Sequence, residues 1–347
     1  MRKTIEMDFE YLPTIDTPPL PPSQLQKQAA SNDDPTIESW RDTWIANQKR
    51  NHDLFGPFAE NGIGKIFGEF HLKPCIIVGS GPSLANNIED LKEAKEISIV
   101  SCLHNFHYLI DNDIDVNYFV TLDAGKITIE EISEGGKHDH EYYLEQTEKH
   151  TLVAFVGTDP DLIKAWKGKV LWYNCPIPDQ RTKDAFDSVE VFHNLMTNGG
   201  NVLGACLYLA KAYLGANPIA YVGADFAFGY KKNFHPWSSK YDGKLGHVLR
   251  AIDCWGNKVL TWQSYHNFKK WHDSIAMRVP GEFINCTEGG TFGVYPEGLI
   301  KYIRHKPLKE FIQGYKLYET MKYQAENPNN GNEILHESLP PQPKLFF

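Results

Sequence analysis

The sequence lacks long apolar runs. No stretch approaches the roughly 18 consecutive apolar residues that a membrane-spanning helix needs, so we expect no membrane span. Residues 1–6 also lack the apolar core of a secretory signal. Basic residues form no stripe and the formal net charge is -9, so a nucleic-acid partner is not expected. These absences together predict a soluble cytoplasmic protein.

Paired cysteines and standard catalytic signatures are missing as well. The six cysteines are scattered and include no C-x-x-C pair, which favours buried free thiols over disulfides or a zinc site. No Walker P-loop, G-x-S-x-G, H-E-x-x-H or kinase motif occurs. Four histidines have no metal-site partners at suitable spacing and are interpreted as structural or surface residues: His104, His107, His266 and His272.

Composition divides the 347 residues into four parts. Residues 1–36 are rich in proline and polar residues and predict an extended or disordered arm. Residues 37–70 predict a helical lead-in, where Trp40 and Trp44 recur at helical spacing. Residues 71–295 form the main domain. Residues 296–347 contain a helix at 307–325 and a tail that we expect to be mobile.

The main domain alternates short apolar runs with amphipathic segments. Strands are predicted at 75–78, 97–101, 118–122, 152–156, 170–172 and 219–222. Helices are predicted at 83–95, 105–111, 161–166, 201–214 and 264–277. This alternation predicts an α/β fold with a Rossmann-like, mostly parallel sheet covered on both faces. The aromatic stretch 229–262 predicts a lid or an insertion, with a hairpin around Gly256-Asn257.

The first strand ends in a glycine turn, Gly79-Ser80-Gly81, followed by Pro82 and Ser83 at the start of a helix. Glycine permits close backbone approach, and proline suits the first helical turn. Free N–H groups and the helix dipole at such a turn favour an anion, especially a phosphate. Gly79, Ser80, Gly81 and Ser83 are therefore candidate nucleotide-binding residues. A plain structural corner without a ligand is the alternative.

A second glycine turn, Gly199-Gly200-Asn201, leads into another apolar helix. Thr197 or Asn198 can cap that helix. Two glycine-led helix starts in one sheet suggest the paired walls of a nucleotide or sugar-phosphate pocket, so Gly199, Gly200 and Asn201 are candidate ligands.

Two aspartates follow buried strands, and ligands of such sheets bind outside the carboxyl ends of the strands. Asp225 and Asp123 are candidates for binding Mg²⁺ beside phosphates or a ribose hydroxyl, and Asp225 is also a candidate catalytic residue. The alternative is that each caps a turn. His235, in the aromatic stretch, is a candidate general acid or phosphate ligand, or alternatively a solvent-facing loop residue.

A third polar cluster follows a short strand near residue 284. Thr287 and Glu288 offer acceptors, and Gly289-Gly290 permits close approach of a ligand. We expect this loop to close the sugar or base pocket, with Glu288 as a candidate catalytic residue.

Five blocks occur in one order along the chain: Ile77-Val78-Gly79-Ser80-Gly81-Pro82-Ser83-Leu84, Thr121-Leu122-Asp123, Gly199-Gly200-Asn201-Val202, Val222-Gly223-Ala224-Asp225-Phe226 and Ile284-Asn285-Cys286-Thr287-Glu288-Gly289-Gly290. Together they resemble the central domain shared by motility-associated-factor (Maf) flagellin glycosyltransferases and archaeal 6-hydroxymethylpterin diphosphokinase (MptE-like) proteins. The resemblance covers roughly residues 70–295. It implies a Rossmann-like sheet related to bacterial sialyltransferases and a nucleotide-bearing substrate at the strand ends.

The resemblance leaves the reaction open. It implies either transfer of a nonulosonic sugar from a CMP-activated donor to a protein or glycan hydroxyl, or transfer of diphosphate from ATP to a pterin alcohol with Mg²⁺. A typical Maf protein is longer and carries extra flanking domains, which argues against flagellin as the acceptor. A third hypothesis is a non-catalytic binding or assembly protein that docks through the arm and the helix around Trp40 and Trp44. The leading expectation is a glycosyltransferase-like, nucleotide-dependent transferase.

Overall fold

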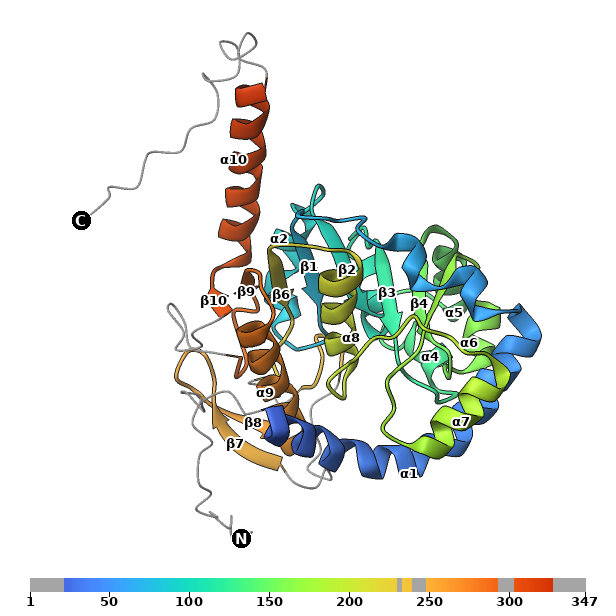
Figure 1. Ribbon diagram of the computed structural model, residues 1–347. Helices are drawn as coiled ribbons and strands as arrows, with labels where there is room; N and C mark the ends of the chain where they lie inside the picture. The colour runs from blue at the N-terminus through green and yellow to red at the C-terminus, as the bar shows by residue number, and fades with distance from the viewer. Residues whose placement is uncertain (1–21, 230–232, 239–247, 293–302, 327–347) are drawn as a thin grey trace.

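The computed structural model describes residues 22–229, 233–238, 248–292 and 303–326. Within these residues, eight strands form one parallel sheet in the order β10-β9-β6-β1-β2-β3-β4-β5 (Figure 1). The strands are β1 (Cys75–Val78), β2 (Ser98–Cys102), β3 (Tyr118–Thr121), β4 (Thr151–Phe155), β5 (Val170–Tyr173), β6 (Ile219–Val222), β9 (Phe283–Asn285) and β10 (Ile303–His305). The predicted α/β fold with a mostly parallel sheet is confirmed.

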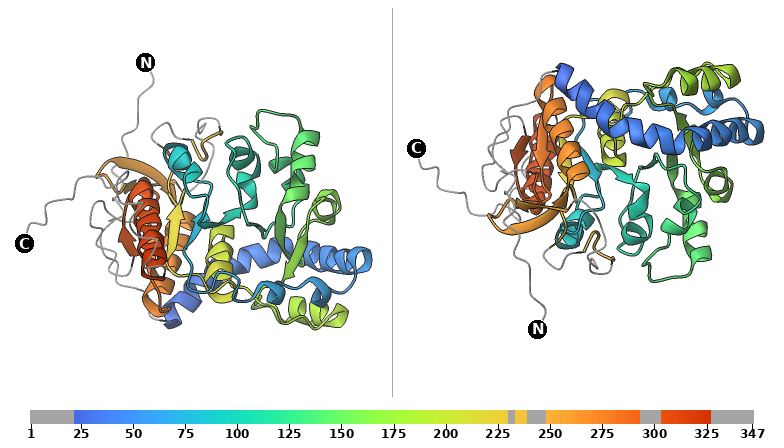
Figure 2. Two further views of the ribbon diagram at one scale, coloured as in Figure 1. Left: turned by 90° about the horizontal axis from the view of Figure 1, so that it is seen from above. Right: turned by 90° about the horizontal axis from the view of Figure 1, so that it is seen from below.

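The central strands are short and apolar because both faces of the sheet are covered. Every residue of β1, β3 and β6 is buried. The helices are α1 (Pro22–Phe55), α2 (Leu84–Lys92), α3 (Phe106–Ile110), α4 (Thr128–Glu131), α5 (His140–Gln146), α6 (Pro160–Ala165), α7 (Gln180–Val189), α8 (Val202–Tyr208), α9 (Gln263–Arg278) and α10 (Leu308–Glu326). Helix α8 packs on β1, β2 and β3, and α2 and α3 lie on the other face (Figure 2).

Helix α1 runs along the carboxyl edge of the sheet, from α9 to α7 (Figure 1). The buried Asn47 amide donates to the carbonyl oxygens of Ala124 and Gly157, which follow β3 and β4. Asn51 donates in the same way to the carbonyl oxygens of Val156 and Thr158. These bonds satisfy strand-end carbonyls that would otherwise be buried without partners. Helix α1 therefore closes part of the edge where ligands of such sheets bind.

The arm prediction is wrong in part, because α1 begins at Pro22 and residues 22–36 are helical rather than extended. Proline is well suited to the first helical position, and the Gln, Leu, Lys and Ala residues that follow favour helix. The rest of the predicted arm, residues 1–21, and the tail from 327 to 347 lie outside the described residues. Phe58 and Phe70 of the lead-in are buried, whereas Phe67 is 75% exposed.

The aromatic stretch after β6 contains the predicted hairpin. Strands β7 (Val248–Ile252) and β8 (Lys258–Trp262) pair antiparallel, and Gly256 occupies the turn at φ +86°. The sequence prediction missed α7 and β10. The single helix predicted at 201–214 consists of α8 followed by a five-residue π-helix, Leu209–Tyr213. All six cysteines are free thiols, as expected. No helix within the described residues has the length and apolar character that crossing a membrane requires.

Candidate active site

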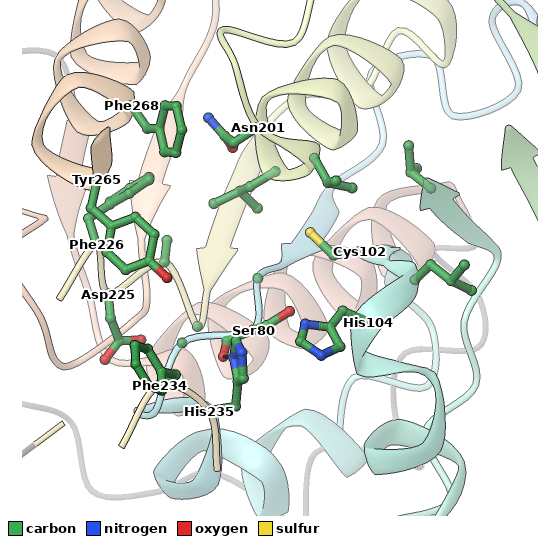
Figure 3. Close-up of a pocket in the computed structure, with 18 of the residues that line it drawn as sticks. Ser80, Cys102, His104, Asn201, Asp225, Phe226, Phe234, His235, Tyr265 and Phe268 are labelled. Carbon is green, nitrogen blue, oxygen red and sulfur yellow. Dashed lines mark hydrogen bonds between the residues drawn. The ribbon is translucent and has the colours of Figure 1, made fainter. Parts of the chain in front are cut away.

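A cavity of about 270 Å³ opens at the carboxyl ends of β6, β1, β2 and β3 (Figure 3). Strands β1 to β5 extend the sheet in one direction, while β6 lies on the other side of β1. The boundary between β1 and β6 is therefore a topological switch point, where open α/β sheets bind their ligands. We call this space the first cavity. Its position follows from the strand order alone.

The turn Gly79-Ser80-Gly81 forms one wall of the first cavity, but its glycines mainly permit close packing against β6. The Gly79 N–H donates to the Val222 carbonyl at 2.8 Å, and the Gly81 N–H donates to the Gly223 carbonyl at 2.9 Å. A Cβ on Gly79 would lie 2.6 Å from the Gly223 oxygen. These two N–H groups therefore bind the protein backbone and do not point at a phosphate, although the turn still lines the cavity.

Asp225 occupies the anion position at the start of α2. Its Oδ1 accepts from the Ser83 N–H at 3.1 Å, and its Oδ2 accepts from the Ser83 hydroxyl at 2.6 Å. The carboxyl is buried, and burial raises its pKa to about 7 against the opposing effect of the Ser83 hydrogen bonds. Since both oxygens have partners, Asp225 is better suited to join β6 to α2 than to bind a metal or a substrate.

Two carboxylates from β3 and α4 supply the acidic side of the first cavity. Asp123 lies two residues beyond the end of β3, and Glu131 is the last residue of α4. The surrounding protein desolvates the carboxyl of Asp123 and so raises its pKa, while the side chain remains accessible from the cavity. Burial and then the neighbouring Asp123 raise the pKa of Glu131 to about 7. The carboxylate of Asp123 thus disfavours ionisation of Glu131, so the first cavity holds two carboxyls whose pKa values are both raised.

Two imidazoles line the cavity beside Ser80 (Figure 3). His235 Nδ1 lies 2.7 Å from the Ser80 carbonyl oxygen. A carbonyl can only accept, so Nδ1 carries the proton and Nε2 of the neutral ring carries a lone pair. Burial lowers the pKa of His235, and burial together with His235 lowers the pKa of His104 to about 3. Both rings are neutral at neutral pH. His235 is therefore suited to accept a proton or a hydrogen bond, rather than to act as the general acid that the sequence suggested.

An aromatic contact fixes the orientation of His235. Its ring stacks on Trp237, with centroids 5.0 Å apart and an interplanar angle of 15°. Trp237 also contacts His104, in the β2–α3 connection, and His107 of α3. The segment containing His235 is thereby held over the end of β2.

The residues of the second glycine turn, Gly199-Gly200-Asn201, line two different cavities. Asn201 lines the first cavity, and its Oδ1 caps α8 by accepting from the Gly204 N–H at 2.9 Å. Gly199 and Gly200 instead line a separate cavity of about 380 Å³, the second cavity. The two glycine turns therefore do not form paired walls of a single pocket. Of the second turn only Asn201 lines the first cavity, and Phe268 of α9 lines both cavities.

The third polar cluster supports the backbone behind Asp225. The Thr287 hydroxyl accepts from the Ala224 N–H at 3.1 Å. Glu288 Oε2 accepts from the Asn87 amide at 2.9 Å and from the Leu308 N–H at 3.1 Å, which joins α2 to the start of α10. A Cβ on Gly290 would collide with the Asp225 backbone. Glu288 thus anchors helices, and the expected role of this loop in closing the first cavity is not seen.

Glu288, Gly289 and Gly290 line a different, open depression of about 700 Å³ beside Asp225. Within the described residues, no cluster of three or more His, Cys, Asp or Glu side chains could hold a metal ion. Of the two predicted metal ligands, Asp225 has both carboxyl oxygens bonded to Ser83, whereas Asp123 lines the first cavity with an exposed side chain. Asp123 is therefore the better placed of the two to contact a ligand.

The sequence prediction missed two cavity residues, His104 and Glu131. His104 follows the end of β2, so the rule that selected Asp123 and Asp225 could have found it. Glu131 gave no such signal, because it approaches Asp123 only after α4 folds back over the strand end.

The strand order and the helices on both faces of the sheet define an α/β protein of the doubly wound class. Its sequence matches the family described as 6-hydroxymethylpterin diphosphokinase MptE-like over residues 46–231, more than half of the chain. The chain belongs to this family, as the sequence blocks predicted. No curated protein matches the sequence.

The fold is similar to that of a solved structure, a Maf glycosyltransferase from Magnetospirillum magneticum AMB-1. The TM-score is 0.55 at 17% sequence identity, and the match covers 81% of this chain. It covers 42% of the Magnetospirillum chain, so the chain corresponds to less than half of that protein's length. This likeness is one of architecture and agrees with the resemblance to Maf proteins.

Proposed function

We propose that this protein is a transferase that binds a nucleotide-activated sugar in the first cavity and passes the glycosyl group to an acceptor hydroxyl. The observation that carries the proposal is a switch-point cavity lined by Asp123 after β3, by Glu131 of α4 and by the neutral imidazoles of His104 and His235. The family and the Maf glycosyltransferase fold support it.

In this reaction the acceptor oxygen forms a bond to the anomeric carbon of the donor. The bond between that carbon and the phosphate oxygen breaks, and its electron pair leaves with the nucleotide. The hydroxyl proton passes to a base, for which the Asp123 carboxylate is suited because burial raises its pKa. His235 would accept a hydrogen bond from the donor at Nε2.

Charge favours a donor with few phosphates. No lysine or arginine lines the first cavity among the described residues, whereas Asp123, Glu131 and Asp225 do. A CMP-activated nonulosonate carries one phosphate, so it meets less repulsion there than a triphosphate. A direct test is incubation with CMP-, UDP- and GDP-sugars while nucleotide release and thermal stabilisation are measured. We expect a response to a CMP-sugar, and the absence of any response would reject the proposal.

The family description favours a second candidate, diphosphate transfer from ATP to a 6-hydroxymethylpterin-like alcohol. Mg²⁺ binds through one or two carboxylates together with substrate phosphates. Asp123 and Glu131 would hold it here, and their mutual repulsion would be relieved. Bound Mg²⁺ would neutralise phosphate charge. This candidate predicts AMP formation from ATP that requires both Mg²⁺ and the alcohol, whereas sugar transfer consumes no ATP.

A non-catalytic binding protein remains the third hypothesis. Its proposed docking residue Trp44 packs against Phe155, with ring centroids 6.1 Å apart, and lines the second cavity. Trp44 is therefore partly buried against the domain, whereas Trp40, the other residue of the hypothesis, is 39% exposed. Replacing Asp123 with Asn separates this hypothesis from the two enzymes, since only the enzymes lose their biological activity.

A further inference from the structure

The second cavity lies beside the first at the same edge of the sheet. It is enclosed by α1, the loop after β5, the turn before α8 and one side of α9. Four aromatic rings contribute to its lining: Trp44, Phe155, Phe268 and Trp271. Its volume of about 380 Å³ falls in the range of small-molecule sites, which is on the order of 300–1,000 Å³.

The polar groups of the second cavity are all neutral. Among the described residues, no Asp, Glu, Lys, Arg or His side chain lines it. Hydroxyl and amide groups do so, from Thr36, Thr197, Asn198 and Ser264. Burying an ionic group without a charged partner is costly, so a phosphate, carboxylate or ammonium ligand does not suit this space.

Aromatic faces combined with neutral hydrogen-bonding groups match the chemistry of a sugar ring. The C–H face of a sugar packs against an indole, and its hydroxyls exchange hydrogen bonds with side-chain hydroxyls and amides. A pterin ring would also stack. Its guanidine-like edge, however, presents adjacent N–H donors that pair best with a carboxylate, and the described lining offers none.

The two cavities share a border at which neighbouring residues face different spaces. Leu122 lines the second cavity, and the next residue, Asp123, lines the first. Likewise, Gly200 lines the second cavity and Asn201 lines the first. Phe268 lines both. A ring held in the second cavity would therefore present a hydroxyl toward Asp123.

We propose that the second cavity is the acceptor subsite and binds an uncharged sugar ring between its tryptophans. Its role in transfer rests on the proposed function, but the binding itself does not. The acceptor hydroxyl would lose its proton to Asp123 while its oxygen attacks the donor carbon at the border.

The test is binding of neutral methyl glycosides, namely the glucoside, the galactoside and the N-acetylglucosaminide, measured by saturation-transfer NMR and tryptophan fluorescence. We expect at least one to bind. Ser264→Trp fills the cavity from an exposed position of α9 without removing a core side chain, and it should weaken that binding about tenfold or more. The matched control is Gln263→Trp, because Gln263 is exposed and does not line the cavity.

Removing an aromatic ring from the lining of the second cavity gives a second test. Trp271→Ala should weaken glycoside binding about tenfold, and Trp271→Phe should restore much of it. Binding of CMP, measured in the same variants, should change little. Absence of binding by all three glycosides, equal effects of Ser264→Trp and Gln263→Trp, or binding of a pterin alcohol in their place would overturn the proposal. Glycoside binding without any nucleotide response would retain the subsite and reject the proposed transfer.

Discussion

The two cavities occupy the same edge of one sheet and differ in charge. The first contains three carboxyls and two histidines, whereas the second is lined by aromatic rings and neutral polar groups. The sheet places both of them, because carboxyl strand ends meet at one edge. The difference lies in the side chains, which suit the first cavity to proton transfer and the second to recognition of shape.

The largest expected effect is on proton transfer in the first cavity. Asp123→Asn removes the base and should lower the transfer rate about 10²- to 10⁴-fold. Binding of CMP should not weaken, because the substitution removes a negative charge from the cavity that holds the phosphate. Steady-state rates and calorimetric titration give the two quantities.

Asp53→Asn is the matched control, since Asp53 is an exposed aspartate of α1 that lines neither cavity. Equal rates for Asp123→Asn and the control would assign proton transfer to another group.

The next effect concerns the wall of the second cavity. Gly199 has φ +59°, and a Cβ there would collide with the Trp271 ring. Gly256 has φ +86°, and a Cβ added there would meet nothing within 4 Å. Gly256→Ala should therefore cost about 1–2 kcal/mol of unfolding free energy from backbone conformation alone. Gly199→Ala should cost more, and it should also weaken glycoside binding.

Chemical denaturation measures both costs. If the two variants lose the same stability, the contact between the turn and α9 is not rigid.

A smaller effect tests Asp225 as a structural residue. Asp225→Ala leaves the buried Ser83 N–H and hydroxyl without their acceptor, at a cost of about 1–3 kcal/mol. Asn can keep both contacts. Because folding raises the pKa of Asp225 from 3.8 to about 7, the folded state binds the proton more tightly than the unfolded state. The stability that this proton supplies is present at acid pH and is lost as the pH rises through about 7.

Asp225→Asn should therefore lose less stability than the wild type as the pH rises from about 4 to about 7. It should also keep transfer activity. A large loss of activity in a fully folded Asn variant would show that Asp225 takes part in the reaction.

The smallest expected effect is the pH dependence of nucleotide binding. The pKa of Glu131 is raised to about 7, so ionisation adds a negative charge to the first cavity as the pH rises through that value. The Kd of CMP should rise with pH, by about fivefold for roughly 1 kcal/mol of repulsion. Glu131→Gln should make the profile flatter. Sugar binding in the second cavity should not follow this pH dependence in either protein.

The sequence predicted the elements more successfully than it predicted the contacts between them. Strands β1 and β6 were predicted to the residue, because each is a short, fully buried run bounded by glycine or proline. The start of α1 was missed because the proline-rich composition concealed good helix formers. The partner of Asp225 could not be foreseen, since Ser83 lies 142 positions away in the sequence.

Contacts between residues far apart in the sequence also limited the prediction of the candidate site. Strand ends could be predicted, so Ser80 and Asp123 were found, and His104 was within reach of the same rule. Which N–H groups of a glycine turn stay free depends on long-range packing. The N–H groups of Gly79 and Gly81 donate to the carbonyl oxygens of Val222, the last residue of β6, and of Gly223, which follows it.

A crystal structure of the protein with CMP, the nucleotide that a CMP-sugar donor leaves behind, would show directly which cavity binds the donor. We expect density for the phosphate and ribose in the first cavity, beside Ser80 and within reach of Asp123, with the second cavity free of nucleotide. Nucleotide bound in the second cavity or in the open depression beside Glu288, or no nucleotide at saturating concentration, would contradict this expectation.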